Sequence, residues 1–453
     1  MAEDISPHRA RKSGSTRILP PSPTRASVRG LLRDPLRFFR TIAEEYGDVV
    51  CYRPAPDIAY LVNHPDHVRH VLVDNNRNYS KETRSNQIFN TVVADGLLTS
   101  EGETWRKQRR LMQPSFHHSR LAPLDGMIAE STDAMLQRWR EASEAGQPID
   151  IAREMAALTL TITTRALFGV ILGDQVREIG EMVNRAARFL EKPSDPRVKQ
   201  SMDELNGVVA GIIEERRRDF RDGGDLLSSM MMAHDGDGTG AMSDEELRNQ
   251  VMTLMLAGYE TTASALTWTW YLLSQNPSEH QRLRQEVRTV LNGRSPRYAD
   301  LERLPQARNV FSEGLRLFPP AWTLGRRALG EDEIGGYYVA PGTVIAICIY
   351  TLQRHPAFWD RPDEFEPDRF TPANSAGRHR FAYIPFGAGP RQCIGNALGL
   401  MEGSLIIAHV AQHFELRLMP DTDVTPQAIF VLRPKRDLMM NLDADGSGDT
   451  TGG

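Results

Sequence analysis

A helical segment of about thirty residues, 243–275, constrains the fold of this chain more than any other feature. The segment opens with Ser-Asp-Glu-Glu, in which Ser243 can cap the first turn while Glu246 reaches back to the cap, the pattern of a capping box. Acidic residues in this turn also suit the positive end of the helix dipole. At 1.5 Å per residue, such a helix spans about 45–50 Å. The sequence therefore predicts one helix that crosses a whole globular domain.

The middle of this segment, LMLAGYETTASAL, places polar groups inside an apolar helix. A carboxylate (Glu260) and two hydroxyls (Thr261 and Thr262) are costly in a core unless they find partners. Gly258 lacks a side chain, so a bulky group could approach the backbone there, and a threonine can bond back to a carbonyl one turn earlier and bend the helix. Two interpretations remain open. One is a core helix with a satisfied polar kink, which these residues alone favour, and the other is a ligand lying across the helix.

A second feature is the glycine-rich loop FGAGPRQCIG, residues 386–395, which holds one of only three cysteines. Its glycines permit positive φ angles and a close approach of the backbone, so that amide groups can point at the sulfur of Cys393 and stabilise a thiolate. The sequence after Gly395 turns helical, and a helix N-terminus lowers a thiol pKa further. Such a cysteine is a nucleophile, a metal ligand or, more commonly, an inert thiol in a tight turn.

Elsewhere, the apolar spacing is mostly helical. Helices are expected at 35–46, 66–73, 103–112, 118–142, 151–169, 175–191, 199–221, 277–291, 304–318 and 394–413. Strand-like runs are fewer and shorter, at 49–52, 59–62, 337–339, 343–349 and 416–418. The pattern predicts a mainly α protein with small β-sheets.

Composition and charge exclude several classes of protein. The chain has 453 residues and a net charge of −5, with 54 basic and 59 acidic residues, which gives no sign of nucleic-acid binding. Cys51, Cys348 and Cys393 form neither a disulfide framework nor a zinc spacing, so we expect a reducing compartment, the cytoplasm. No secretory signal is recognisable, and no apolar run reaches the ~18 residues of a membrane span. The polar ends, 1–18 and 441–453, are expected to be disordered.

The cysteine loop and four further motifs resemble those of the cytochrome P-450 family, the haem-thiolate monooxygenases, and in particular its soluble bacterial members. The loop matches at every signature position. The other motifs follow the family's order: Trp105-x-x-x-Arg109, Ala257-Gly258-x-Glu260-Thr261-Thr262, Glu313-x-x-Arg316 and Pro367-x-Arg369-Phe370. Each motif alone is weak, but the ordered set is specific. The resemblance covers roughly residues 20–440, and one departure is Gly399, where the family often has alanine.

The resemblance implies a fold and a cofactor. The family forms one large, mainly α domain, here 19–440, instead of the two or three domains that length alone suggests. Cys393 is then the axial thiolate of haem b, which favours cleavage of the O–O bond of O2. Phe386 packs beside the sulfur. The remaining implied haem-binding residues are Trp105, Arg109, Arg326 and Arg391, which bind the propionates, together with Ala257, Gly258 and Gly395.

The resemblance also assigns catalytic and structural roles. Thr261 orients a water at the dioxygen and Glu260 connects it to solvent, so that two protons arrive before the O–O bond breaks. Glu313, Arg316 and Arg369 form a structural network. In isolation, an E-x-x-R pair is weak evidence, because such pairs are common on helix surfaces.

The resemblance implies the substrate and the electron donor in less detail. By analogy, the pocket is lined by apolar segments at 88–98, 180–200, 252–259, 321–324 and 429–431, which suits a lipophilic substrate such as a terpene or a fatty acid. Electrons are expected from a separate ferredoxin or flavodoxin-type donor with its NAD(P)H reductase. Arg106, Lys107 and Arg110 either face this donor or form a solvated helix face. A non-catalytic haem-binding sensor or redox protein and a helical interaction protein remain alternatives, although the first has no need of Glu260 and Thr261.

Overall fold

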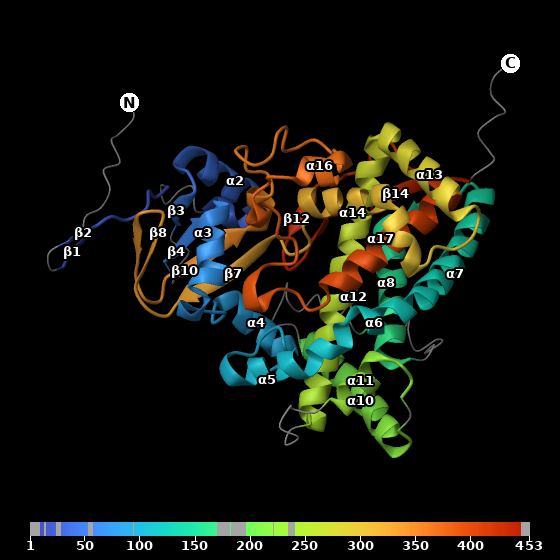
Figure 1. The fold of residues 1–453 in the computed structure, drawn as a ribbon, viewed down its shortest axis with the longest axis horizontal. Helices are drawn as coiled ribbons and strands as arrows, with labels where there is room; N and C mark the ends of the chain where they lie inside the picture. The colour runs from blue at the N-terminus through green and yellow to red at the C-terminus, as the bar shows by residue number, and fades with distance from the viewer. Residues whose placement is uncertain are drawn as a thin grey trace. The chain divides into compact units, whose positions relative to one another are not determined.

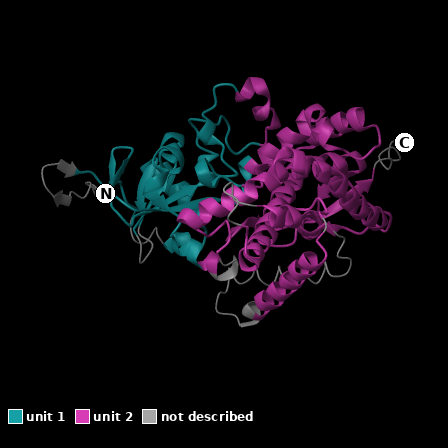
Figure 2. Cartoon of the chain, turned by 60° about the horizontal axis from the view of Figure 1, so that its bottom comes forward, with its two compact units in different colours: residues 1–87, 316–364, 376–393 teal, residues 88–315, 365–375, 394–453 magenta. Residues whose placement is uncertain are grey.

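The computed structural model describes residues 10–12, 15–23, 29–52, 58–93, 95–169, 182, 196–220, 222–233 and 241–444. The chain forms two compact units (Figure 2). Unit 1 comprises residues 1–87, 316–364 and 376–393, and unit 2 comprises residues 88–315, 365–375 and 394–453. Helices α4 (Arg84–Val93) and α14 (Pro305–Leu317) contribute to both. The prediction of a mainly α protein with small sheets is confirmed (Figure 1).

Unit 1 is built on a five-stranded sheet of order β3-β4-β10-β7-β5, in which only the β4–β10 pair is parallel. Its other elements are short helices and two hairpins. The strands and hairpins are β1 (Ala10–Lys12), β2 (Ser15–Arg17), β3 (Val49–Tyr52), β4 (Ala59–Val62), β5 (Tyr79–Ser80), β7 (Thr323–Ala328), β8 (Asp332–Ile334), β9 (Tyr337–Val339) and β10 (Val344–Cys348). The helices are η1 (Arg29–Leu32), α2 (Pro35–Tyr46), α3 (Pro65–Arg69), η2 (His70–Asp74), η3 (Asn76–Asn78), α15 (Ile349–Leu352), η9 (Arg380–Ala382) and η10 (Gly389–Arg391).

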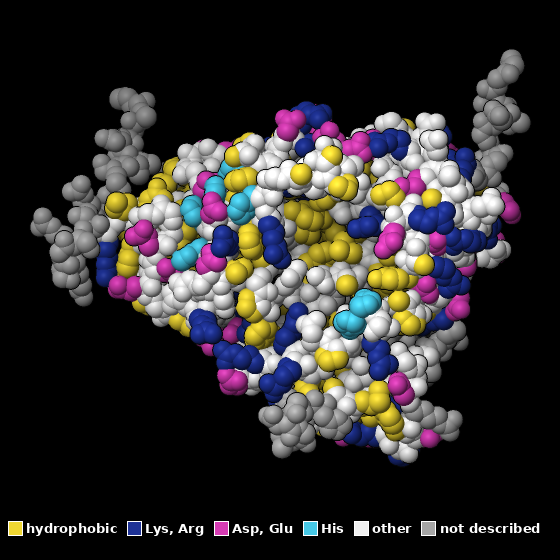
Figure 3. All heavy atoms as spheres, in the orientation of Figure 1, with side chains coloured by type: hydrophobic (Ala, Val, Ile, Leu, Met, Phe, Trp, Pro, Cys, Tyr) yellow, Lys and Arg dark blue, Asp and Glu magenta, His cyan; other side chains and the backbone are white. Residues whose placement is uncertain are grey.

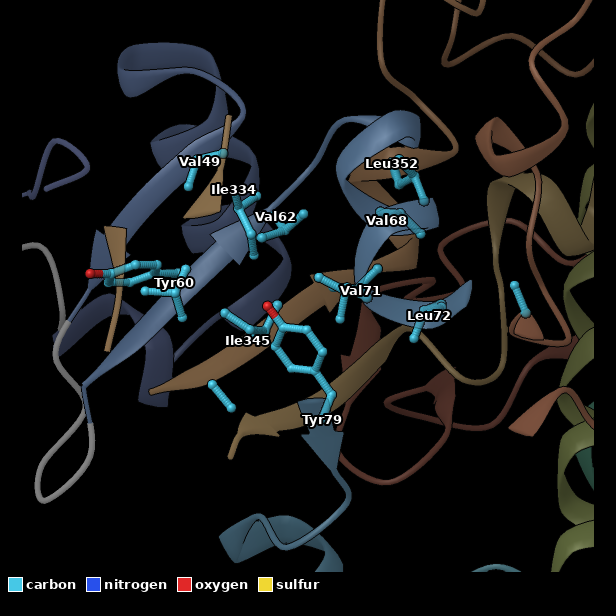
Figure 4. Packing of buried hydrophobic residues seen from close by; sticks show 14 of the residues in the cluster. Val49, Tyr60, Val62, Val68, Val71, Leu72, Tyr79, Ile334, Ile345 and Leu352 are labelled. Atoms are coloured by element: carbon cyan, nitrogen blue, oxygen red, sulfur yellow. The ribbon is translucent and has the colours of Figure 1, made fainter. Parts of the chain in front are cut away.

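The core of unit 1 lies between this sheet and the α3–η2 segment (Figure 4). Val68 and Val71 are fully buried and belong to one cluster with Ile345 of β10 and Tyr79 of β5. The helix expected at 66–73 is in fact split into α3 and a π-helical turn, η2. The η2 turn of this core contacts η10, which lies within the cysteine loop.

Unit 2 is mainly helical. Its helices are α5 (Gly102–Met112), η4 (Gln113–Phe116), α6 (His118–Leu121), η5 (Ala122–Leu124), α7 (Asp125–Glu144), α8 (Ile151–Phe168), α10 (Pro196–Arg218), α11 (Leu226–Met232), α12 (Asp244–Gln275), α13 (Pro277–Leu291), η7 (Tyr298–Arg303), η8 (Pro367–Phe370), α16 (Pro372–Ser375) and α17 (Asn396–His413). Its strands form a three-stranded sheet, β11-β14-β6, and a hairpin, β12-β13; they are β6 (Ile149–Asp150), β11 (Phe414–Leu418), β12 (Pro426–Ala428), β13 (Leu432–Pro434) and β14 (Met439–Ala444).

The long helix predicted at 243–275 is α12, which packs along α8 and also contacts α17 (Figure 1). Its capping box forms as expected: Ser243 Oγ accepts from the Glu246 amide at 3.1 Å, and Glu246 Oε2 accepts from the Ser243 amide at 2.8 Å. Both tryptophans in its second half, Trp268 and Trp270, are fully buried. The helix is therefore the core element that its apolar pattern indicated.

The expected boundaries differ from the structure in a few places. The helix expected at 118–142 is broken into α6, η5 and α7, with Pro123 inside the connecting 3-10 turn. The helix expected at 175–191 lies almost entirely outside the described residues. Within the ends expected to be disordered, β1 and β2 pair as a hairpin, and β14 continues to Ala444. For the rest of 1–18 and 441–453, and for the domain limits 19–440, disorder and boundaries stay predictions.

Candidate active site: a cysteine loop and a hydroxyl-rich helix

Residues 386–393 of the cysteine loop belong to unit 1, and backbone conformation explains the glycines at 387 and 389. Gly387 and Gly389 adopt φ angles of 69° and 70°, in the left-handed region that favours glycine. A Cβ atom at Gly389 would also collide with the backbone carbonyl of Leu72, in the η2 turn. The Cys393 amide donates to the Phe386 carbonyl at 2.9 Å, which closes the loop. The turn thus explains the glycines at 387 and 389, and Phe386 is tied to Cys393 through the backbone.

Cys393 differs from the other two cysteines in its exposure. Cys51 and Cys348 are buried in unit 1, and burial raises the pKa of the Cys348 thiol, which suits inert core residues. The side chain of Cys393, in contrast, is exposed. A thiol held outward by a closed, glycine-rich turn is what an axial ligand of haem iron requires, so this loop fits the haem group that the sequence implies. Helix α17 begins at Asn396, three residues later in the chain.

Helix α12 leaves one stripe of its central face partly accessible. Leu254, Ala257, Gly258 and Thr261 are half-buried at helical spacing, whereas the residues between Ala263 and Trp270 are buried. An otherwise buried helix with a local accessible stripe fits the interpretation of a ligand lying across it. This stripe includes three of the positions that the sequence assigns to cofactor binding and catalysis.

The threonines of α12 bond back to the preceding turn, as the sequence suggested. Thr261 Oγ1 donates to the Ala257 carbonyl at 2.7 Å, and Thr262 Oγ1 donates to the Gly258 carbonyl at 3.1 Å. A third hydroxyl, Thr159 Oγ1 of α8, donates to the Tyr259 carbonyl at 3.0 Å. Three consecutive carbonyls therefore accept side-chain hydroxyls, so the hydroxyls of Thr261, Thr262 and Thr159 each have a partner.

A side chain at position 258 would point towards α8. A Cβ atom there would meet Thr163 Cγ2 at 3.3 Å. The glycine therefore permits close packing of α12 against α8, which gives this position a structural role besides the cofactor-binding role expected for it.

The side chain of Glu260 is half-buried beside a fully buried phenol. Burial raises the pKa of Tyr259, and the charge of Glu260 raises it further, whereas Arg433 of β13 opposes this. Tyr259 is therefore neutral, and the carboxyl of Glu260 is the other ionisable group of this turn.

The four residues expected to bind haem propionates fall into two pairs. Trp105 and Arg109 lie one turn apart on α5 in unit 2, and both line the same surface cavity. Arg326, on β7, and Arg391, in η10, belong to unit 1. Arg326 is buried, and its Nη1 donates to the Gly325 carbonyl at 2.8 Å. A buried guanidinium of this kind is suited to an anionic partner.

The structural network of Glu313, Arg316 and Arg369 is buried. Glu313 is 0% exposed and accepts a hydrogen bond from the Glu366 amide at 2.9 Å; its Oε1 lies 3.4 Å from Nε of Arg369. Arg316 is also 0% exposed and donates to the carbonyls of Gln353, Pro362 and Glu364 at 3.1, 2.6 and 2.9 Å. The E-x-x-R pair is therefore not a surface pair, because each member ties a loop to the end of α14.

Two features were missed by sequence reasoning. Phe89 of α4 and Phe430, at the tip of the β12–β13 hairpin, have ring centroids 4.3 Å apart. Glu402 of α17 is 4% exposed, and burial raises its pKa to about 8, so this carboxyl is mostly neutral at pH 7. The Phe89–Phe430 contact joins residues far apart in sequence and has no local signal, whereas Glu402 interrupts the apolar pattern of α17 and could have been noticed.

Comparison with known proteins identifies the class. The family model for cytochrome P450 matches residues 20–441. Similar curated proteins include cyclooctatin synthase of Streptomyces melanosporofaciens, 39% identical over 88% of this chain and 89% of the relative, and cyclooctat-9-en-7-ol 5-monooxygenase of the same organism, 35% identical over 86% and 87%. Pentalenene oxygenase of Streptomyces avermitilis is 31% identical over 92% and 95%. The crystal structure of the cytochrome P450DA heme domain aligns with a TM-score of 0.88 and 27% identity, over 94% of this chain and 98% of that one.

The chain belongs to the cytochrome P450 family. It is a monooxygenase that binds haem through a cysteine thiolate, uses O2, acts on a lipophilic small molecule and needs a redox partner. Among the residues described in the structure, no helix is long and apolar enough to cross a membrane. The P450 fold and the monooxygenase class predicted from the sequence are thereby confirmed.

Proposed function

We propose that this chain hydroxylates or epoxidises a terpene, with Cys393 as the axial thiolate. The observation that carries the assignment of the ligand is the outward-facing thiol of a glycine-closed loop, since the other two cysteines are buried. The support for a terpene comes from relatives named as cyclooctat-9-en-7-ol 5-monooxygenase and pentalenene oxygenase. A ferredoxin or flavodoxin-type donor with an NAD(P)H reductase supplies the electrons, and the cytoplasm remains the predicted location.

The chain's own residues hold the cofactor in this proposal. Haem with a thiolate ligand supplies the oxygen chemistry, because the sulfur pushes electron density that favours O–O cleavage. Phe386 packs beside the sulfur and tunes its basicity. Arg326, Arg391, Trp105 and Arg109 bind the two propionates through charge-assisted and neutral hydrogen bonds. The backbone near Gly395 and the Ala257–Gly258 turn complete the haem site.

Thr261 and Glu260 handle protons. A hydroxyl has one donor and two acceptor lone pairs, and the Thr261 proton is already given to the Ala257 carbonyl. Its oxygen therefore remains an acceptor and can hold a water by accepting one of its protons, which leaves the second proton of that water to be directed at the dioxygen. Glu260 is half-buried and can exchange protons with solvent to recharge this water. Thr261 thus orients the water, and Glu260 supplies the proton.

Thr261→Ala is expected to uncouple the reaction. Without the hydroxyl, the water loses its anchor, so electrons end in hydrogen peroxide and product per NAD(P)H falls by about tenfold or more. The measurement is the ratio of product and peroxide to NAD(P)H consumed. Thr262→Ala is the matched control, because Thr262 makes the same back-bond one residue further along but is buried. Coupling that is unchanged in Thr261→Ala, or equally poor in both variants, would refute the role of Thr261.

The apolar face for the substrate includes the Phe89–Phe430 contact. The hairpin that carries Phe430 is fixed to α12, because the Leu432 carbonyl accepts from Ser264 Oγ at 2.5 Å and from Trp268 Nε1 at 2.8 Å. Both rings are half-buried, so each keeps apolar area that a ligand can cover. This geometry supports the expected pocket segments 88–98 and 429–431, and within 252–259 the half-buried residues Leu254, Ala257 and Gly258 keep accessible area. Of the other two, 180–200 lies largely outside the described residues, and 321–324 belongs to unit 1.

A spectral-shift screen tests the proposed substrate class. Terpene hydrocarbons and their mono-alcohols are expected to convert the ferric haem from low to high spin, with fatty acids much weaker. Phe430→Ala removes one large aromatic face and should weaken terpene binding by about ten- to a hundredfold, from the area lost. Phe220→Ala, at an exposed ring on the same unit, is the control and should leave binding unchanged. Tight binding of fatty acids with no response to terpenes would contradict the terpene assignment.

A further inference from the structure

Helix α8 carries four threonines in its second half, and Thr163 differs from the others in its hydrogen bonding. The hydroxyls of Thr159, Thr161 and Thr164 each donate to the carbonyl four residues earlier, at 2.9, 2.8 and 2.9 Å. The hydroxyl of Thr163 makes no hydrogen bond to any group that the structure describes. A helical threonine has two favourable rotamers, and its hydroxyl faces a neighbouring element when it does not bond back. The proton of this hydroxyl is therefore available to a partner that is not a described protein group.

The side chain of Thr163 borders the place where Gly258 of α12 has no side chain. A Cβ atom at Gly258 would lie 3.3 Å from Thr163 Cγ2 and 3.4 Å from Thr163 Oγ1. Apart from the chain neighbours of Gly258, no other described side chain comes within 4 Å of that Cβ position. We call the space between Gly258 and Thr163 the Gly258 notch. It lies within unit 2, where α8 and α12 run side by side (Figure 1), and both of its residues are half-buried, so a small molecule can reach it.

The Gly258 notch adjoins Thr261. Residues three apart on a helix are neighbours, with Cβ positions about 5–6 Å apart, and Gly258 and Thr261 share the accessible stripe of α12. The Thr261 side chain stays more than 4 Å from the Cβ position at Gly258, so the two do not fill the same space. One water bridges two oxygens that are up to about 5.5 Å apart, because each O–H···O hydrogen bond spans about 2.7–2.8 Å. The hydroxyls of Thr163 and Thr261 are therefore placed to share a water.

These two hydroxyls offer complementary groups to such a water. Thr261 gives its proton to the Ala257 carbonyl, so it can only accept from a water, whereas Thr163 can donate to the water oxygen. A water between them accepts one proton from Thr163 and donates one to Thr261, which leaves its second proton for another acceptor. A water held by a single hydrogen bond rotates about that bond. The second anchor at Thr163 is therefore what fixes the direction of the remaining proton.

The surroundings of the notch favour a neutral water over an ion. On the face drawn in Figure 3, Lys, Arg, Asp and Glu side chains are spread over the surface of the molecule, whereas the polar group that borders the notch is the hydroxyl of Thr163. An ion away from bulk solvent needs a compensating charge, which a hydroxyl does not supply. The carbonyls of residues 257–259 already accept side-chain hydroxyls, which leaves them little capacity to compete for the protons of the water.

We propose that Thr163 is a positioning residue of this monooxygenase, whose hydroxyl holds, from the Gly258 notch, the water that Thr261 directs at the dioxygen. The inference deepens the proposed function and rests on it, because it concerns the same proton delivery. The water gives one proton to the dioxygen and regains one that Glu260 supplies, while Thr163 and Thr261 keep their own protons. Thr163 thus contributes the orientation of the water and takes no part in the chemical step.

Thr163→Val tests the proposal, because valine keeps the shape of the side chain and removes the hydroxyl. With the terpene that gives the largest spin shift, product per NAD(P)H should fall by about two- to fivefold, and the missing electrons should appear as hydrogen peroxide. Thr163→Ser restores a hydroxyl and should restore coupling, and the dissociation constant of the terpene should be unchanged in both variants. Thr161→Val is the matched control, because Thr161 is half-buried on the same helix but its proton is already given to the Ala157 carbonyl.

A crystal structure of the haem-loaded protein at a resolution of about 1.5 Å gives a readout that does not depend on turnover. The wild type and Thr163→Ser should show a water within about 2.6–3.2 Å of both the hydroxyl at 163 and Thr261 Oγ1, and Thr163→Val should lack it. A wild-type structure without this water would overturn the proposal. Coupling that is unchanged in Thr163→Val, or equally poor in Thr161→Val, would overturn it as well.

Thr261→Ala separates a failure of this inference from a failure of the proposed function. Full coupling in Thr261→Ala would remove the proton-delivery role on which both depend. Poor coupling in Thr261→Ala together with normal coupling in Thr163→Val would remove only the role of Thr163. Adding Thr163→Val to Thr261→Ala should cause no further loss, because the water has then already lost the hydroxyl that orients it. An additional, independent loss in the double variant would contradict the proposal, since Thr163 would then act elsewhere.

Discussion

Replacing Cys393 with histidine will abolish monooxygenation while leaving a folded protein. The loop that holds residue 393 is fixed by Gly387 and Gly389 and by the backbone hydrogen bond to Phe386, none of which involves the sulfur. An imidazole can take the same outward position and bind iron, but it lacks the electron donation of a thiolate that favours O–O cleavage. The expected result is haem retention with loss of the thiolate band in the reduced carbon-monoxide spectrum, and product formation at background level.

The control for this substitution is Cys348→Ala. Cys348 is buried in β10, so its loss costs some packing energy but should leave the carbon-monoxide spectrum and the turnover per haem unchanged. If Cys393→His keeps the thiolate band, or if Cys348→Ala loses it, the ligand has been assigned to the wrong cysteine.

Replacing Glu313 with alanine is expected to lower the free energy of unfolding by about 3 kcal/mol, since buried Arg369 loses one of its two carboxylate partners and keeps only Glu366, at 2.9 Å. Glu313 is 0% exposed, whereas Arg369 is 8% exposed and sits 3.4 Å from it. The amide of Glu366 also loses its acceptor, so the 365–370 segment loses its anchor to α14. The measurement is urea unfolding at matched haem loading, followed together with the fraction of haem retained.

A surface ion pair provides the comparison. Glu44 pairs with Arg40 at 2.9 Å, but its side chain is 63% exposed, so Glu44→Ala should cost no more than about 1 kcal/mol. Glu313→Gln keeps an acceptor for the Glu366 amide without the charge and should fall between the two. Equal losses for Glu313→Ala and Glu44→Ala would mean that the buried network contributes little to stability.

Helices, strands and turns whose signals lie in the local sequence could be predicted well. The capping box, the apolar content and the length of 243–275 gave α12 to within one residue, and the strands at 49–52 and 59–62 match β3 and β4. The cysteine loop was predictable because its glycines meet a backbone requirement, which the positive φ angles of Gly387 and Gly389 bear out. In each case, the sequence signal and the physical cause lie within a few residues of each other.

Features that depend on distant partners were not predictable. Strand β7 pairs with both β10 and β5, and its polar sequence, Thr-Leu-Gly-Arg-Arg-Ala, shows no clear alternation. The absence of a side chain at Gly258 makes room for Thr163, a residue of another helix. The sequence named Lys107 as a residue that could face a donor, and only its contact with Glu246 shows that it is paired internally.

The residues of the cofactor site were named through the family resemblance rather than through local physics. Buried Arg326 and the paired Trp105 and Arg109 are compatible with propionate binding, but their pattern in the sequence alone indicates no ligand. Their roles therefore stay predictions, as does the assignment of Glu260 and Thr261 to proton delivery.

The ligand sphere of the iron tests the central claim most directly. X-ray absorption at the iron edge of the purified ferric protein should show one sulfur scatterer in addition to the four porphyrin nitrogens, and Cys393→His should replace that sulfur with nitrogen. A wild-type spectrum with nitrogen or oxygen scatterers alone would contradict the account, because the thiolate of Cys393 would then not hold the metal.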